Sequence, residues 1–314
     1  MKYKTIHVLV IFITILFAIN LESKPKIAFT FDDPNTLDTP LMTWQQRNGN
    51  ILTTLNKYHI KVALFVCGKR VVDENGIMLL NTWDNYGHLI CNHSFSHLYY
   101  NSPKAVAEIF WADVLKGDSI IRDYKNYSKF FRFPFLKEGT DKNNRNYIRK
   151  KMKSIGYKVG YVSIDASDWY IDAEMTKVLS IDPKIDLTPY KEYLLKHLLN
   201  RAIFYNDLAV KLTGREINHT ILLHHSLLNA LFLDDILAMF KKNGWELVDV
   251  DKAYQDEFYQ TPPNIVPAGE SIIWAKAKQT GRYEDILRYP AEDSEYEKDS
   301  LSNYIEQYNR IKTK

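Results

Sequence analysis

The sequence predicts an α/β fold in which parallel strands alternate with helices, arranged as a barrel or as an open sheet. Two observations predict this class. Short apolar runs typical of buried strands recur along the chain, and they alternate with longer segments in which apolar residues have helical spacing. The chain has 314 residues, of which 46% are hydrophobic, so one large domain or two smaller ones could bury a sizeable core.

The predicted strands are apolar runs that stop at polar residues. The first covers residues 26–31 (KIAFTF) and ends in Asp32 and Asp33. The second covers residues 61–67 (KVALFVC), and the helical signals between these two strands complete one βαβ unit. Further strands are expected over residues 87–91, 129–133, 158–164, 220–224 and 246–250.

Several predicted helices begin at capping residues. Ser102–Pro103 and Thr188–Pro189 each combine a capping residue with a proline suited to the first helical position, and they begin helices expected to run to about residues 124 and 212. Thr39–Pro40 opens a loop or a helix by the same reasoning. Two more helices are expected over residues 141–155 and 227–242, whereas residues 170–187 are expected to be an insertion loop.

The first residues are typical of a targeting segment. Lys2 and Lys4 precede an apolar run, residues 8–18, that is shorter than the ~20 residues a bilayer-spanning helix needs. We therefore expect residues 1–23 to be a secretory signal peptide, with an uncleaved anchor as the alternative. The protein is expected to be exported to the periplasm, the cell surface or the medium. Cys67 and Cys91 are open to two interpretations, one disulfide or two buried thiols.

The alternation of strands and helices fails from about residue 260. Residues 24–259 are therefore expected to form the catalytic domain and residues 260–314 a C-terminal extension. Residues 284–314 carry clustered charges and few bulky aliphatics, so we expect loose packing there, with a terminal helix over 300–312. Forty-one Lys and Arg residues against 38 Asp and Glu leave a net charge of +3, which indicates no nucleic-acid partner, and no stable protein partner is predicted.

Most of the unusual polar residues lie at the ends of predicted strands, where parallel α/β folds place their active sites. Asp32 and Asp33 end the first strand. The other members are His93 and His97 after the third strand, Arg132, Pro134 and Phe135 after the fourth, Asp165, Asp168 and Trp169 after the fifth, and His224 and His225 after the sixth. Each is a weak signal alone, but the ordered set is hard to attribute to chance.

The set contains the ligands of a catalytic metal site. His93, His97 and Asp33 supply two imidazoles and one carboxylate, which can hold a divalent metal and leave positions for water and substrate. Because the two histidines are four residues apart, we expect them to share one face of a helical turn. A metal held in this way lowers the pKa of the water it binds towards ~7.

The remaining residues can transfer protons. Asp32 is free to take a proton from water, and Arg132 could orient it by a charge-assisted hydrogen bond. His224, held protonated by Asp168, suits the protonation of an amine leaving group. A backbone N–H near Phe135 could help to stabilise the oxyanion.

Five segments carry these residues: TFDD (Thr30–Asp33), HSFSH (His93–His97), RFPF (Arg132–Phe135), DASDW (Asp165–Trp169) and LLH (Leu222–His224). Over about residues 26–250 they resemble the ordered motifs of the polysaccharide deacetylase family, the NodB-homology domain of carbohydrate esterase family 4. The resemblance implies a distorted parallel (β/α) barrel. It also implies a divalent metal, usually Zn²⁺ with Co²⁺ as the alternative, and removal of acetyl groups, most often N-acetyl, from a cell-wall or extracellular polysaccharide.

Carried over motif by motif, the resemblance implies the roles given above and adds Trp169 and Leu222 as the lining of an acetyl pocket. Phe135 stands where the family normally has Tyr, which should alter substrate contacts more than the chemistry. His225 follows the motif histidine where an acidic residue is common, so we assign the acid to His224 and a packing role to His225. Two other functions stay open: hydrolysis of a non-sugar amide on the same fold, and carbohydrate binding without catalysis.

Overall fold

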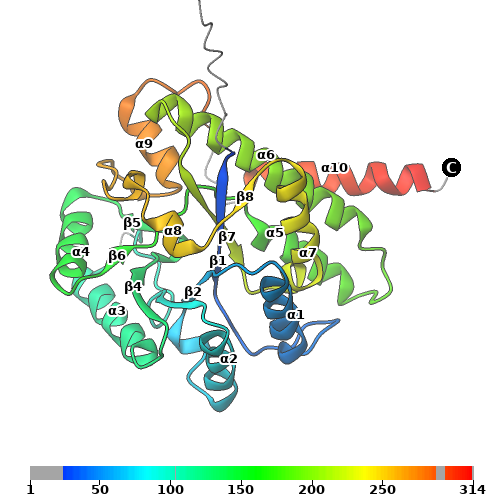
Figure 1. Ribbon diagram of the computed structural model, residues 1–314, viewed down its shortest axis with the longest axis horizontal. Coiled ribbons are helices and arrows are strands. Elements are labelled where there is room, and N and C mark those ends of the chain that lie inside the picture. The colour runs from blue at the N-terminus through cyan, green and yellow to red at the C-terminus, as the bar shows by residue number, and fades with distance from the viewer. Residues whose placement is uncertain (1–23, 103, 288–293, 313–314) are drawn as a thin grey trace, which may run out of the picture.

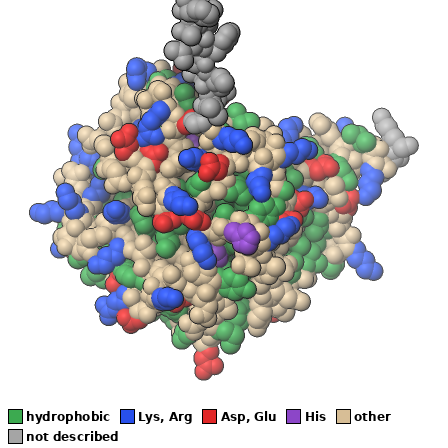
Figure 2. All heavy atoms as spheres, viewed as in Figure 1, with side chains coloured by type: hydrophobic (Ala, Val, Ile, Leu, Met, Phe, Trp, Pro, Cys, Tyr) green, Lys and Arg blue, Asp and Glu red, His purple; other side chains and the backbone are tan. Residues whose placement is uncertain are grey.

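The computed structural model describes residues 24–102, 104–287 and 294–312 (Figure 1). The predicted signal peptide, residues 1–23, lies outside this range. Among the described residues, no helix is both long and apolar enough to cross a lipid bilayer. Lys and Arg side chains are interspersed with Asp and Glu side chains over the face drawn in Figure 2, in keeping with the small net charge.

A curled parallel sheet forms the centre of the fold (Figure 1). Its strands are β1 (Lys26–Asp32), β2 (Ala63–Val66), β3 (Leu89–Asn92), β4 (Tyr127–Phe131), β6 (Lys158–Val159), β7 (Asn218–His224) and β8 (Glu246–Leu247). They follow the order β6-β4-β3-β2-β1-β7, and β8 pairs with the first residues of β1. All of β1 except Lys26 is buried, as in a parallel strand covered on both faces. Cys67 and Cys91 are both buried free thiols.

The predicted strand 158–164 is divided between two neighbours. β6 pairs only with β4, whereas Ile164 forms an isolated parallel bridge with Ile221 of β7. The chain thus leaves one edge of the sheet and joins the other, which curls the sheet into the expected distorted barrel. Gly160 lies at this bend, where any Cβ would lie 2.4 Å from the Phe65 ring, so only glycine fits.

Helices cover the outside of the sheet (Figure 1). Those between the strands are α1 (Trp44–Lys57), α2 (Glu74–Asn85), α3 (Ala107–Ile121), α4 (Lys142–Ser154), α5 (Asp168–Leu179), α6 (Thr188–Thr213), α7 (Leu227–Lys242) and α8 (Val250–Tyr254). The predicted helices 141–155, 188–212 and 227–242 correspond to α4, α6 and α7. Helix α2 was not predicted.

One helix start and one strand end differ from the predictions, and Thr39–Pro40, for which a loop and a helix were both expected, forms a loop. Ser102 caps a turn, since its Oγ accepts from the N–H of Lys104, and α3 begins only at Ala107. Thr39–Pro40 lies in a loop, and α1 is capped by Thr43. The strand predicted over 246–250 ends at Leu247, because α8 begins at Val250.

The predicted insertion loop 170–187 is wrong over its first half, which forms α5. Ile171, Met175 and Leu179 are four residues apart and fully buried. This stripe has the spacing of the buried face of an amphipathic helix. Residues 180–187 form the connection to α6 and contain no helix or strand.

Much of the C-terminal extension packs into the same core. β9 (Ala268–Gly269) pairs antiparallel with β5 (Lys137–Gly139), and α9 (Ile272–Thr280) begins with two fully buried isoleucines. α10 (Glu295–Lys312) packs beside α6, and its far end extends away from the body (Figure 1). Glu297 and Leu301 are buried, so the loose packing expected over 284–314 is wrong for the first part of α10. The domain boundary at residue 260 stays a prediction.

Candidate active site

Asp32, the last residue of β1, is held by a buried guanidinium group. Its Oδ1 accepts a hydrogen bond from Nη1 of Arg132 at 2.5 Å. Arg132 also donates to Thr30 Oγ1, to the carbonyl oxygen of Gly160 and to the hydroxyl of Tyr254. Because the donors of Arg132 are used in several directions, the guanidinium group fixes the orientation of the Asp32 carboxylate.

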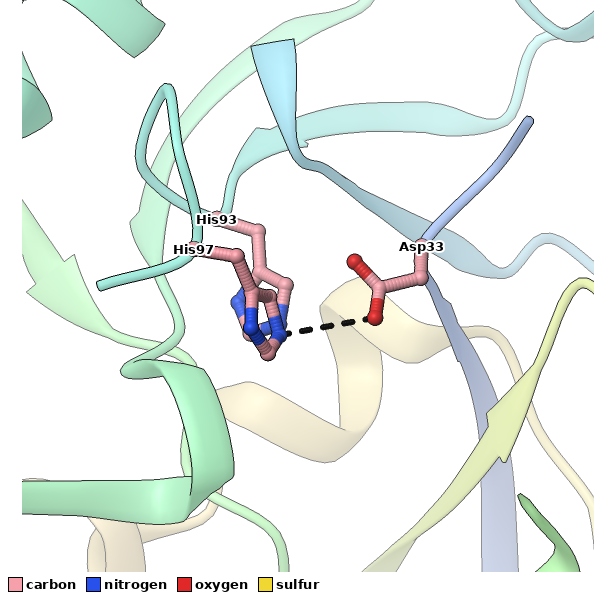
Figure 3. Close-up of side chains that lie close together, drawn as sticks. All are labelled: Asp33, His93 and His97. Atoms are coloured by element: carbon pink, nitrogen blue, oxygen red, sulfur yellow. Dashed lines mark ion pairs between the residues drawn. The ribbon is translucent and has the colours of Figure 1, made fainter. Parts of the chain in front are cut away.

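His93 and His97 lie in the loop after β3 and face Asp33 from across the cleft (Figure 3). The centroids of their rings are 4.9 Å apart, and Nε2 of His97 lies 3.4 Å from Oδ2 of Asp33. One donor atom from each of the three residues lies within 4.8 Å of the others. The expected helical turn is wrong, because Ser94 and His97 have positive φ angles of 64° and 59° and the segment is a loop.

Tertiary contacts shape this histidine loop. Asp113 of α3 accepts hydrogen bonds from the N–H groups of Phe95 and Ser96 and from the Ser96 hydroxyl. Gly117 lets α3 approach, since a Cβ there would lie 2.6 Å from Oδ1 of Asn92. The contacts with α3 therefore bring the two imidazoles together. The four-residue spacing of the histidines in the sequence is not sufficient by itself.

The three residues fit a divalent metal. Nδ1 of His93 lies 2.8 Å from the carbonyl oxygen of Arg132. A carbonyl can only accept, so Nδ1 carries the proton and the lone pair of Nε2 faces the site. Oδ1 of Asp33 is buried without a hydrogen-bond partner among the described residues. Burial lowers the pKa of His93 to about 3, which keeps the imidazole in the neutral form that a metal requires.

His224 ends β7 and is oriented by Asp168, the first residue of α5. One carboxylate oxygen lies 2.7 Å from Nδ1 of His224, and the other accepts from the His224 backbone N–H at 2.8 Å. Asn229 of α7 donates to the same carboxylate at 2.6 Å and to the His224 carbonyl. Since Nδ1 is engaged, Nε2 is the ring nitrogen of His224 available to the cleft.

The protein environment raises the pKa values of both Asp32 and His224. Burial raises the pKa of Asp32 to about 6, against the opposing attraction of Arg132. Burial alone would lower the pKa of His224, but the adjacent Asp168 carboxylate outweighs it and raises the value to about 9. At neutral pH, Asp32 is thus available as a base and His224 carries a proton that it can donate.

Asp32, Asp33, His93, His97 and His224 line a cleft of about 580 Å³ at the carboxyl ends of the strands. Trp169 and Leu222 contribute to its wall, and Leu222 packs with Leu136 and Val162 in a small apolar cluster. Phe135 lies at the rim, 45% exposed, with its ring centroid 4.7 Å from that of His97. The cleft therefore offers an apolar surface next to the polar groups.

Backbone strain is concentrated around the cleft. Of the nine non-glycine residues with positive φ in the described part of the chain, six belong to the segments that form it: Asp33, Ser94, His97, Phe135, Leu136 and Ser167. Each such conformation costs about 1–3 kcal/mol and persists only where surrounding contacts hold it. Strain of this kind is typical of segments that orient functional groups.

His225 points away from the acid position. It is buried, its Nε2 lies 3.2 Å from Oδ1 of Asn48, and its ring packs edge-on against Trp83. Burial lowers the pKa of His225 to about 3, so the ring is neutral at neutral pH and cannot act as an imidazolium acid. The structure thus places this side chain in the core, where the sequence analysis expected it to pack.

Replacing His225 with Ala is expected to lower stability and leave the turnover number close to that of the parent. Loss of the Trp83 and Asn48 contacts should cost about 1–3 kcal/mol of unfolding free energy, the usual range for a core truncation. Urea titration and acetate release measure the two effects. A His225→Ala protein without activity, beside an active His224→Ala protein, would assign the proton donor to His225.

Sequence reasoning missed several residues that support the site. Arg47 of α1 is buried and donates to the carbonyl oxygens of Asn35 and Leu37, so it holds the loop after β1. Arg70 lies 3.3 Å from Oδ2 of Asp33, and Asp172 accepts from the backbone of α7 beside the cleft. A signal was present for Arg47, because it falls on the apolar stripe of α1, where a charge requires an internal partner.

Known proteins share this sequence pattern and fold. Residues 20–160 match the sequence profile of the family described as polysaccharide deacetylase. Peptidoglycan-N-acetylglucosamine deacetylase PgdA of Listeria monocytogenes is 22% identical over 240 residues, which are 75% of this chain and 40% of the relative. Peptidoglycan-N-acetylmuramic acid deacetylase PdaA of Bacillus subtilis is 25% identical over 201 residues, 64% of each chain. The chain thus spans less than two thirds of the length of either relative.

Two solved structures have a similar fold. Peptidoglycan deacetylase PdaC from Bacillus subtilis superposes with a TM-score of 0.50 at 22% identity, over 74% of this chain and 91% of that one. BA3943, a CE4 family pseudoenzyme from Bacillus anthracis, gives 0.51 at 13% identity, over 74% and 66%. At these identities the likeness concerns the fold alone. Residues 20–160 are thus similar in sequence to the polysaccharide deacetylase family, and the fold of the chain agrees with that similarity.

Proposed function

We propose that the protein is a metal-dependent hydrolase that removes N-acetyl groups from a cell-wall polysaccharide, with peptidoglycan as the first candidate. The observation that carries this proposal is the convergence of three elements in one cleft. They are the set Asp33, His93 and His97, the Asp32–Arg132 pair and the His224–Asp168 pair. The substrate is suggested by the names of the relatives, which act on peptidoglycan.

Asp33, His93 and His97 would hold the metal. Two imidazoles and one carboxylate are typical of catalytic Zn²⁺, and Co²⁺ is the alternative that the same donors accept. When bound, such an ion polarises the acetyl carbonyl and lowers the pKa of water. The loop held by Asp113 and the carbonyl oxygen of Arg132 fix the two imidazoles in place for this task.

The two proton-transfer residues complete the hydrolysis. Asp32 takes a proton from water as the water oxygen forms its bond to the acetyl carbon, and Arg132 keeps the carboxylate aimed at that position. Nε2 of His224 then gives its proton to the amide nitrogen as the C–N bond breaks. The products are acetate and a free amine, and Asp168 stabilises the His224 imidazolium before it gives up the proton.

The apolar part of the cleft fits the methyl group of an acetyl substituent. Leu222 is 7% exposed beside Trp169, which leaves a small apolar surface next to the polar groups. Phe135 and Tyr99 form an edge-on aromatic pair at the rim, where a sugar ring could pack. Since the proposed polymer lies outside the cell, we also propose that the protein is exported, as the first 18 residues predict.

Acetate release from a panel of polymers tests the proposal. The purified chain, reconstituted with Zn²⁺, should release acetate from peptidoglycan or from chitin oligomers and poly-N-acetylglucosamine, and less from acetylxylan, whose acetyl groups are esters. A chelator should abolish release, and added Zn²⁺ or Co²⁺ should restore it. Binding of a sugar polymer with no acetate from any member of the panel would indicate a carbohydrate-binding protein instead.

A further inference from the structure

The last helix places a carboxylate in the protein interior. Glu297, in the first turn of α10, is fully buried, and its Oε1 lies 2.9 Å from Nη2 of Arg201 on α6, which is also fully buried. The two helices lie side by side in Figure 1. Most other side chains of α10 are exposed or partly exposed. A fully buried ion pair adds little to stability by itself. Stability alone therefore does not explain the Glu297–Arg201 pair, so the alternative is a role in function.

The pair is connected to the backbone just before Asp168. His197 lies one turn before Arg201 on α6, and its Nε2 is 3.4 Å from Oε1 of Glu297 and 2.8 Å from the carbonyl oxygen of Ala166. Because that carbonyl can only accept, Nε2 of His197 carries a proton and donates it to Ala166. Glu297 thus lies against both a guanidinium group and the N–H that holds Ala166.

Ala166 belongs to the segment that positions the proton donor. The next residue, Ser167, has a φ of 46°. Asp168 then begins α5, and its carboxylate accepts hydrogen bonds from the backbone N–H and from the Nδ1–H of His224. A non-glycine residue in the left-handed region keeps that conformation only where its surroundings hold it. The hydrogen bond from His197 to Ala166 is one of the contacts that do so.

We propose that Glu297 is a positioning residue for the reaction. Together with Arg201 it holds His197 on Ala166, and through this bond it keeps Asp168 aimed at His224. The kinetic part of this inference rests on the proposed function, whereas the arrangement of Asp168 and His224 does not. The C-terminal extension therefore supports the active site through Glu297 of α10, and the barrel of residues 24–259 alone would lack this support.

Substitution of Glu297 tests the proposal in the full-length chain. Glu297→Gln removes the charge at nearly constant shape, and Glu297→Asp retains it. Tyr304→Phe is the matched control, because it removes a surface hydrogen bond between the same two helices, from Tyr304 to Glu192. The first readout is the low-field proton NMR signal of the His224 Nδ1–H bound to Asp168, assigned by its absence in His224→Ala. The second readout is the pair of kinetic constants kcat and KM, each determined separately.

In Glu297→Gln, the His224 signal should shift or broaden and kcat should fall about tenfold, a loss typical of a slightly misplaced group, with KM unchanged. Glu297→Asp should recover part of both, and Tyr304→Phe should resemble the parent. A folded Glu297→Gln protein with the parent signal and kcat would overturn the proposal.

If Glu297→Gln does not fold, His197→Leu makes the same test with the Glu297–Arg201 pair intact. If the parent releases no acetate, the proposed function fails and the NMR signal alone decides this inference.

Discussion

His97→Ala is expected to lose tight metal binding and acetate release together, with little change in fold. Nε2 of His97 lies 3.4 Å from Asp33 in the three-residue set, so its removal leaves two donors. The loss of Zn²⁺ affinity should exceed the ~10–100-fold that removal of an outer-shell partner costs. Zinc content after dialysis, circular dichroism and acetate release measure the three properties on one preparation.

His59→Ala is the matched control for this substitution. His59 and His97 both have positive φ, 54° and 59°, so alanine causes similar backbone strain at either position. His59 is exposed, and it is not a member of the set formed with Asp33. The control should keep its metal and activity. Full zinc occupancy in His97→Ala would refute the proposed metal site.

Asp32→Asn should keep the metal and lose most of the rate. The amide oxygen can still accept from Arg132, but the group no longer takes up a proton, and removal of a general base costs about 10²–10⁴-fold in rate. Measured kcat on the preferred polymer, with zinc content determined on the same sample, separates the two effects. An Asp32→Asn enzyme with the parent kcat would show that another group takes the proton.

The neighbouring carboxylate provides the contrast. Asp33→Asn makes the same chemical change one residue later, at the group that faces His97, and should lower zinc occupancy as well as rate. The two variants therefore distinguish a base from a ligand. Equal zinc loss in both would mean that the pair acts as one metal-binding unit, with no separate base.

The ends of the two long central strands were predictable from local pattern. β1 and β7 are largely apolar near their carboxyl ends, where each is closed by a polar residue of the site, Asp32 and His224. Helix α5 was missed although Ile171, Met175 and Leu179 have helical spacing, because the polar residues between them are more conspicuous than the stripe. The packing of α10 was missed because Glu297 and Leu301 are its only described buried side chains, too few to mark a core helix in a charged segment.

The sequence by itself determined which chemical groups stand at the ends of the strands, because strand periodicity and the parallel arrangement depend on neighbouring residues. Only the tertiary structure decided how those groups are presented. Nε2 of His93 is the free nitrogen because Nδ1 meets the carbonyl of Arg132, 39 residues away. His224 carries a proton because α5 brings Asp168 to it across 56 residues. Tautomer, pKa and orientation depend on contacts between distant segments, and no local pattern encodes those contacts.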